Sequence, residues 1–191
     1  PTPVSALLHA VAVVKAGAFA VLRLIYYGFG ADFLRGSWAQ TVVMTATIVT
    51  IVYGSARALR TPHLKRRLAF STVSNLSYIL FALTLMTPGG IVGGMTHMVY
   101  HAFTKITMFC CAGAIIVKSG REYIYELEDF GRAMPIVFAP FTVSSFALIG
   151  VPPLGGFAGK WMIAEAAVAS QNPLAYAGIG ALILSTLLTT L

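Results

Sequence analysis

The run GGMTHMVYHAFTKITMFCCAGA, residues 93–114, is long and apolar but holds three ionisable side chains, His97, His101 and Lys105. Their spacing of four residues places them on one face of a helix, along about 12 Å of its axis. Ionisable groups are costly at membrane depth, and residues of this kind mark proton or ion pathways. The run therefore predicts a membrane helix that carries a proton relay on one face.

The rest of the chain has the composition of an integral membrane protein. Of its 191 residues, 58% are hydrophobic and only 10% are charged, and the mean hydropathy is +0.83. This composition predicts an all-α fold whose helices cross a hydrocarbon core of about 30 Å. We expect a single domain, a polytopic bundle of about six transmembrane helices, formed by residues 4–27, 38–56, 70–86, 91–117, 135–170 (broken at 150–156) and 174–191.

The third of these segments, residues 70–86, is short and partly polar. It carries Ser71, Ser74, Asn75 and Ser77. Polar side chains in a membrane helix form hydrogen bonds across helices rather than face lipid. We therefore expect the polar turn of this segment to face the other helices of the bundle.

The two ends of the chain also carry information. The sequence begins at Pro1 without an initiator methionine and stops at Leu191 within an apolar run. The first apolar segment lacks the basic region and the small-residue cleavage site of a signal peptide. We expect a piece of a longer polypeptide that is a multi-pass protein of the prokaryotic cytoplasmic (inner) membrane.

Basic residues gather in two loops that are separated by two predicted crossings. Both loops then face the same side of the membrane, whereas Arg23 and Arg35 lie near the opposite side. An excess of Lys and Arg marks the cytoplasmic side, and this placement explains the net charge of +7 without a nucleic-acid partner. The lipid bilayer is the expected partner of these residues, which are Arg57, Arg60, Lys65, Arg66, Arg67, Lys118, Arg121 and Arg132.

The fifth segment is interrupted by the sequence GVPPLGG, residues 150–156. Proline removes backbone donors and glycine removes helical restraint, so this sequence breaks the helix. A broken helix at membrane depth is typical of the ion sites of secondary transporters, and Lys160 follows the break by four residues. We interpret Lys160 as a relay group, the alternative being a structural kink beside a snorkelling lysine.

Three further ionisable residues lie in apolar segments. Lys15 lies near the middle of the first segment, where burial favours its neutral form and so allows proton exchange. His9 is a secondary candidate, because a histidine titrates near neutrality but is also a common packing residue. Glu165 follows Lys160 by about 140° of helix rotation, so the two do not face each other and the role of Glu165 stays open.

No catalytic, cofactor or metal site is expected. His97 and His101 have the i, i+4 spacing of some zinc ligands, but no glutamate lies between them and the cation Lys105 opposes a metal charge. The adjacent Cys110 and Cys111 suit neither a metal nor a disulfide. Nucleophile elbows, phosphate loops and Cys-x-x-Cys pairs are absent from the sequence, and Gly89–Gly90 and Gly93–Gly94 indicate a turn and close helix packing.

Three stretches carry a resemblance to one large family. PTPVSALLHAVAVVKAG (1–17), MTHMVYHAFTKITMF (95–109) and GVPPLGGFAGKW (150–161) resemble the antiporter-like, proton-translocating membrane subunits of three systems. These are respiratory complex I (NADH:quinone oxidoreductase chains L, M and N), Mrp sodium/proton antiporters and group 4 hydrogenases. The first and third stretches look most similar to the Mrp D-type or hydrogenase-linked subunits.

The resemblance implies a fold with inverted repeats, of which this chain would supply one helix and the second repeat. It implies a proton relay through Lys15, His97, His101, Lys105 and Lys160, with His9 as a linking group. The glutamate and lysine that form a pair in the family's first repeat would precede Pro1. It also implies partners, namely other membrane subunits and protons.

Two other functions stay open at this level. The chain could be a structural membrane anchor whose buried charges only hold neighbouring helices, or an unrelated secondary transporter of a small solute. Within the favoured function, the sequence leaves open which complex contains the chain, whether sodium accompanies the proton, and which reaction drives transport.

Overall fold

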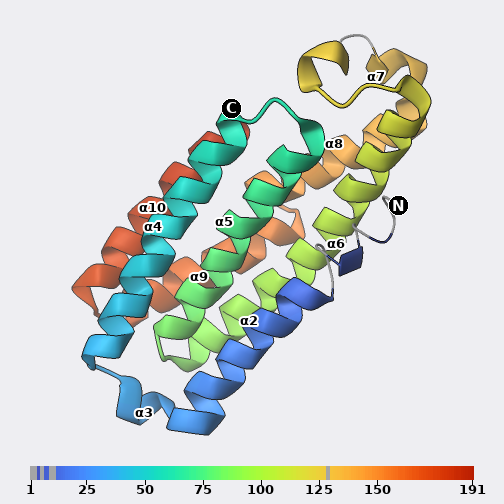
Figure 1. Cartoon of the computed structure of the whole chain (residues 1–191). Helices are drawn as coiled ribbons and strands as arrows, with labels where there is room; N and C mark the ends of the chain where they lie inside the picture. The colour runs from blue at the N-terminus through green and yellow to red at the C-terminus, as the bar shows by residue number, and fades with distance from the viewer. Residues whose placement is uncertain (1–3, 5–6, 9–11, 128–129) are drawn as a thin grey trace.

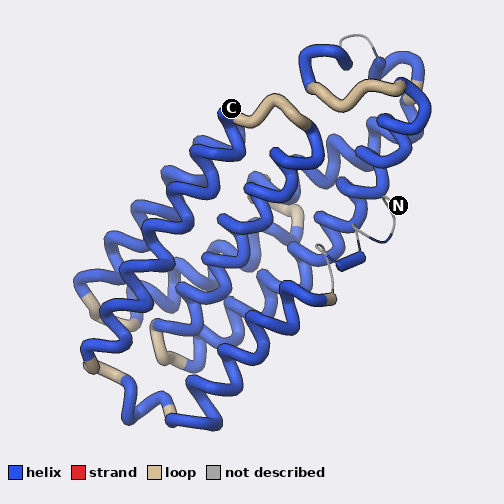
Figure 2. The backbone as a smooth tube through the Cα atoms, in the orientation of Figure 1, coloured by secondary structure: helices blue, strands red, loops and turns tan. Residues whose placement is uncertain are grey.

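The computed structural model describes residues 4, 7–8, 12–127 and 130–191, and within them the chain is helical without a strand (Figures 1 and 2). The all-α prediction is confirmed for this part of the chain. The elements are α2 (Val13–Arg23), its π-helical continuation η1 (Leu24–Phe29), α3 (Ala31–Leu34), α4 (Trp38–Arg60), α5 (Leu64–Thr84), α6 (Pro88–Ser119), η2 (Ile124–Leu127), α7 (Phe130–Ala133), α8 (Pro135–Ile149), α9 (Gly155–Ala169) and α10 (Pro173–Thr190).

Three of the described helices, α4, α6 and α10, are long and apolar enough to cross a membrane, and α8 is a shorter apolar helix. The long helices run side by side in one bundle (Figure 1). The count of six crossings and the exact boundaries of the segments stay predictions.

The stretch that is predicted to carry the relay lies in α6, the longest described helix, and local signals define both ends of this helix. Thr87 is the N-cap, its hydroxyl accepting the backbone N–H of Gly90 at 3.1 Å, and Pro88 occupies the first turn. At the other end Gly120 adopts the left-handed conformation, with φ of 69°. Such a glycine ends a helix because it has no Cβ to clash there.

Helix α6 packs against α5, α8 and α9, so its ionisable face is surrounded by protein. Close approach depends on glycine. A Cβ at Gly93 would lie 3.0 Å from the backbone nitrogen of Ile163 on α9, closer than an ordinary van der Waals contact. The prediction that Gly93 serves close helix packing is confirmed.

The predicted break in the fifth segment is present between α8 and α9. Gly150 ends α8 in the left-handed conformation, with φ of 93°, and Pro152 and Pro153 follow before α9 begins at Gly155. The carbonyls at the end of α8 therefore lack helical partners and are available to other donors.

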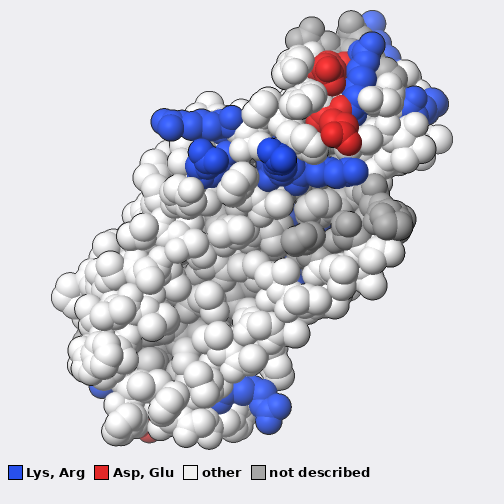
Figure 3. Space-filling view, in the orientation of Figure 1, with Lys and Arg blue, Asp and Glu red and all other residues white. Residues whose placement is uncertain are grey.

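The two basic loops meet at one end of the bundle, as predicted from their separation by two crossings. Leu64 donates its backbone N–H to the carbonyl of Glu122 at 3.0 Å, and His63 Nε2 lies 3.1 Å from Glu122 Oε2. Lys and Arg side chains gather at this end in Figure 3. On the face shown, Lys, Arg, Asp and Glu side chains lie mainly at the two ends and few lie between them, as expected for a protein that crosses a membrane.

Candidate functional site

The three ionisable residues of α6 all face the interior of the bundle. His97 and His101 are 3% exposed, and Lys105 is fully buried. The two imidazole rings are stacked, with centroids 6.1 Å apart. The one-face geometry predicted from the spacing of four residues is therefore found in the fold.

Lys105 is held by oxygens of α5. Its ammonium donates to the carbonyl of Leu68 at 3.1 Å and to the hydroxyl of Ser71. Both acceptors are neutral, so the lysine is solvated by protein dipoles rather than neutralised by a carboxylate. Such a site holds the ammonium without an ion pair that would fix its charge.

Helix α5 also orients His97. Its Nε2 lies 3.2 Å from the amide oxygen of Asn75, and the Asn75 amide donates to the carbonyl of Ser71 at 2.8 Å. The polar turn of residues 70–86 thus faces the other helices of the bundle, as predicted, and Ser71 and Asn75 face α6.

The other ring nitrogens of His97 and His101 are not held by a hydrogen bond of this kind. Nδ1 of His97 and both ring nitrogens of His101 are buried and have no hydrogen-bond partner among the described residues. Buried polar atoms in proteins are satisfied by protein or by ordered water in the great majority of cases. The row therefore presents free hydrogen-bonding capacity inside the bundle, which a purely structural cluster does not need.

Lys160 caps the broken helix. Its ammonium donates to the carbonyls of Leu148 at 3.1 Å and Ile149 at 2.8 Å, the last residues of α8, and to the hydroxyl of Thr186 at 3.1 Å. A cation at a helix C-terminus is stabilised by the free carbonyls and the helix dipole. The break and the lysine are thus one structural unit.

Tyr78 of α5 stands between His97 and Lys160. Its ring centroid is 5.5 Å from that of His97, and the Lys160 ammonium lies 5.5 Å from the same centroid. The Tyr78 hydroxyl donates to Ser185 Oγ, which also bonds the hydroxyls of Ser55 and Ser74. A buried cluster of hydroxyls therefore extends from the row into α4 and α10.

The other candidates lie in different surroundings. Lys15 is 6% exposed on α2, and α2 packs against α5, the helix that contacts His97 and Lys105. Glu165 is exposed on α9 and does not face the row. His9 lies outside the described residues.

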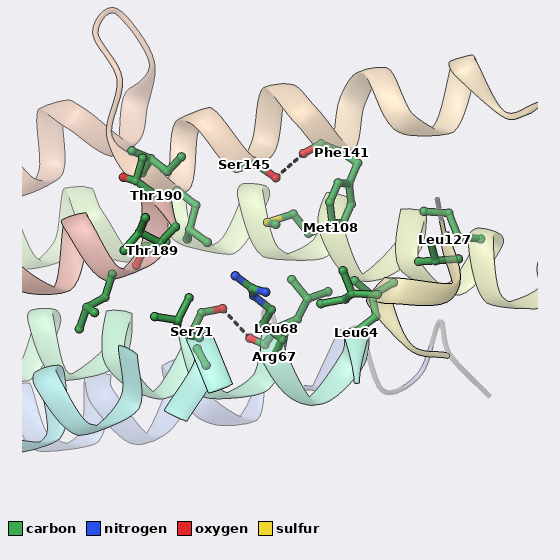
Figure 4. A pocket seen from close by; sticks show the side chains of 18 of the residues that line it. Leu64, Arg67, Leu68, Ser71, Met108, Leu127, Phe141, Ser145, Thr189 and Thr190 are labelled. Atoms are coloured by element: carbon green, nitrogen blue, oxygen red, sulfur yellow. Dashed lines mark hydrogen bonds between the residues drawn. The ribbon is translucent and has the colours of Figure 1, made fainter. Parts of the chain in front are cut away.

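A cavity of about 500 Å³ opens at the end of the bundle that carries the basic loops. Leu68 and Ser71, which accept hydrogen bonds from Lys105, lie in its wall, and so do Leu148 and Ile149, which accept from Lys160. Figure 4 shows Arg67 among the side chains that line it. The cavity thus reaches the partners of both lysines from one end of the bundle.

Asn75, Tyr78 and the α8 carbonyls were not predicted as parts of the site. The i, i+4 and i, i+7 spacing of Ser71, Asn75 and Tyr78 was a usable signal, because it places three polar groups on one face of α5. The α8 carbonyls gave no such signal, since their exposure depends on how the chain continues after the break.

Comparison with protein families gives a match over nearly the whole chain. The family described as NADH:quinone oxidoreductase/Mrp antiporter, TM, matches residues 1–189. Among curated proteins, NADH-quinone oxidoreductase subunit L of Rickettsia conorii is 34% identical over 190 residues, which cover 98% of this chain and 27% of that protein. NADH-quinone oxidoreductase subunit N of Parvibaculum lavamentivorans is 34% identical over 181 residues, 94% of this chain and 37% of that protein.

Two solved structures have the same fold. A chain of the membrane-bound sulfane sulfur reductase, an archaeal respiratory membrane complex, gives a TM-score of 0.90 at 28% identity and covers all of this chain and 38% of its own length. A chain of the Mrp complex from Dietzia sp. DQ12-45-1b gives a TM-score of 0.84 at 27% identity, over 99% of this chain and 35% of its own. This chain therefore spans only about a quarter to two fifths of the length of the relatives described.

Proposed function

Because the chain belongs to the NADH:quinone oxidoreductase/Mrp antiporter transmembrane family, we propose that it moves protons through the row of Lys15, His97, His101, Lys105 and Lys160. It is a multi-pass protein of the inner membrane. Relatives of this chain are subunits of multi-subunit membrane complexes. We propose that this chain likewise works beside other membrane subunits, in a complex of the NADH:quinone oxidoreductase, Mrp or hydrogenase type.

One observation carries the proposal. His97 and His101 are buried with three ring nitrogens that have no partner among the described residues, directly between two lysines held by neutral oxygens. A cluster that only joins helices gains nothing from unpaired polar atoms, which cost about 1–3 kcal/mol each. We propose that ordered water between these nitrogens supplies hydrogen bonds to them and a route for protons.

Each group has a role that follows from its position. Lys105 and Lys160 take up and release protons while carbonyls and hydroxyls hold the ammonium in place. His97 and His101 pass protons between the two lysines, and Asn75 keeps the His97 ring oriented. The cavity beside Leu68 and Ser71 gives access from the end with the basic loops, which we assign to the cytoplasm.

The test replaces each lysine by a residue that keeps its hydrogen bonds but carries no titratable charge. Lys105→Gln and Lys160→Gln provide an amide donor for the same acceptors. In the full-length protein, reconstituted in sealed vesicles, we expect each variant to lose most proton translocation and to remain folded. Proton movement is measured as quenching of a pH-sensitive dye.

The control is Lys118→Gln, which removes a cation from the exposed end of α6 without touching the row. We expect it to translocate protons at the wild-type rate. If Lys105→Gln and Lys160→Gln also translocate protons at that rate, the buried lysines serve only to hold helices together. The membrane-anchor function then replaces the one proposed.

A further inference from the structure

A second cavity, of about 670 Å³, lies on the side of the bundle where α4 and α5 meet near the basic end. Three arginines line its charged part: Arg57 and Arg60 from the last turn of α4, and Arg66 from the first turn of α5. The apolar part is lined by Phe70, Val73 and Leu76 of α5. We call this the arginine groove.

The arginines of the groove have no acidic partner in the part of the chain that the structure describes. Within the described residues, none of the three forms an ion pair, and the lining of the groove contains no Asp or Glu. The guanidinium of Arg57 lies 5.5 Å from the centroid of the Phe70 ring, a contact that fixes its position. Three guanidinium groups around one groove match an anion with several oxygens, above all a phosphate.

The apolar part of the groove runs along α5, away from the arginines. Phe70, Val73 and Leu76 are spaced by three residues and so follow one another along α5. Leu76 lies ten residues beyond Arg66, about 15 Å along the helix axis and toward the middle of the apolar surface. Val73 is 43% exposed, so an apolar side chain beside the arginines is free to contact another apolar group.

We propose that the arginine groove binds an anionic phospholipid, its phosphate between the three guanidinium groups and one acyl chain along Phe70, Val73 and Leu76. Basic pockets between transmembrane helices on the cytoplasmic side are known to bind anionic headgroups. A free phosphate would use the arginines alone and leave the apolar part unused. Since Val14 of α2 also lines the groove, the lipid contacts the helix that carries Lys15 as well as α4 and α5.

The test uses the full-length protein in vesicles of equimolar phosphatidylcholine and phosphatidylglycerol. Spin-labelled phosphatidylglycerol and phosphatidylcholine report, by electron paramagnetic resonance, how strongly each lipid is held at the protein surface. The variant Arg57→Gln/Arg60→Gln/Arg66→Gln should lower the preference for phosphatidylglycerol by at least about tenfold, which corresponds to about 1.4 kcal/mol. The matched control Lys65→Gln/Lys118→Gln/Arg132→Gln removes three cations outside the groove and should keep the preference.

A second variant, Val73→Trp, fills the apolar part and leaves every arginine in place. It should lower the retention of the long-chain lipid without changing the binding of water-soluble glycerol phosphate. The proposal is overturned if the triple arginine variant keeps the wild-type preference, or if the control loses as much, because a general surface potential then explains the binding. Full displacement of the lipid by glycerol phosphate also overturns it, since the groove is then a site for free anions.

Discussion

Gly159 of α9 lies against His97 of α6, and its replacement by alanine is a direct test of the proposed path. A Cβ at Gly159 would lie 2.8 Å from both Cα and Cβ of His97 and 3.0 Å from its Nδ1. Ordinary contacts between carbon atoms are about 3.5–4.0 Å. Because two of the three obstructing atoms belong to or adjoin the α6 backbone, α9 must move away by roughly 1 Å.

The displacement has separable effects on stability and on proton transfer. Overpacking of this size costs about 1–3 kcal/mol, and the higher helix propensity of alanine offsets about 1 kcal/mol of it. The variant should therefore fold. Proton transfer depends far more steeply on distance, and a misplacement of about 1 Å can cost about a hundredfold in rate. Since Lys160 moves with α9 relative to His97, we expect Gly159→Ala to lower translocation by about tenfold to a hundredfold.

The assay measures dye quenching in sealed vesicles and thermal unfolding of the same preparation. Gly180→Ala is the matched control, because a Cβ at Gly180 has no atom within 4 Å. The control should translocate protons at the wild-type rate and be slightly more stable. If Gly159→Ala is folded and as fast as Gly180→Ala, then protons do not pass between His97 and Lys160.

Three further predictions follow from individual contacts. Asn75→Ala removes the group that orients His97 and should lower translocation about tenfold, the effect of losing one buried hydrogen bond of about 1–2 kcal/mol. Ser185→Ala takes the partner of the Tyr78 hydroxyl away and should lower the free energy of unfolding by about 1–3 kcal/mol, measured by denaturant titration in micelles. Glu165→Gln changes an exposed side chain, so translocation should stay at the wild-type rate and stability should change by less than about 0.5 kcal/mol.

Asn75→Ala and Ser185→Ala each have a control on the same helix. Among the described residues, the hydroxyl that Ser77→Ala removes bonds only to the carbonyl of Val73. The hydroxyl that Thr190→Ala removes bonds there only to the carbonyl of Thr186. Equal effects of Asn75→Ala and Ser77→Ala would show that His97 needs no orientation by α5. A loss of translocation in Glu165→Gln would show that the Glu165 carboxylate takes part in proton transfer.

The sequence predicted the parts of the site that depend on spacing within one helix. The shared face of His97, His101 and Lys105 follows from a repeat of four residues. The break before Lys160 follows from glycine and proline chemistry. In both cases neighbours along the chain determine the outcome.

The parts that the sequence did not predict depend on which helices are neighbours in space. Asn75 and His97 are 22 residues apart, and Ser55 and Ser185 are 130 apart. Helical periodicity places each of these residues on a face but does not say which helix that face meets. The role of Glu165 stayed open for the same reason. Helical periodicity gives its angle from Lys160 around α9, but not that its side of α9 is exposed.

The neutral partners of the lysines explain how the row can respond to its own charges. Lys105 and Lys160 donate to carbonyls and hydroxyls, whereas a buried carboxylate partner would hold each ammonium charged by several kcal/mol. With neutral partners, the largest variable influence on one group is the charge of the next. At about 8 Å and an effective dielectric constant of about 20, a unit charge changes a neighbour's protonation free energy by about 2 kcal/mol. That is about a thirtyfold change in occupancy, enough for a proton bound at one residue to displace a proton from the next.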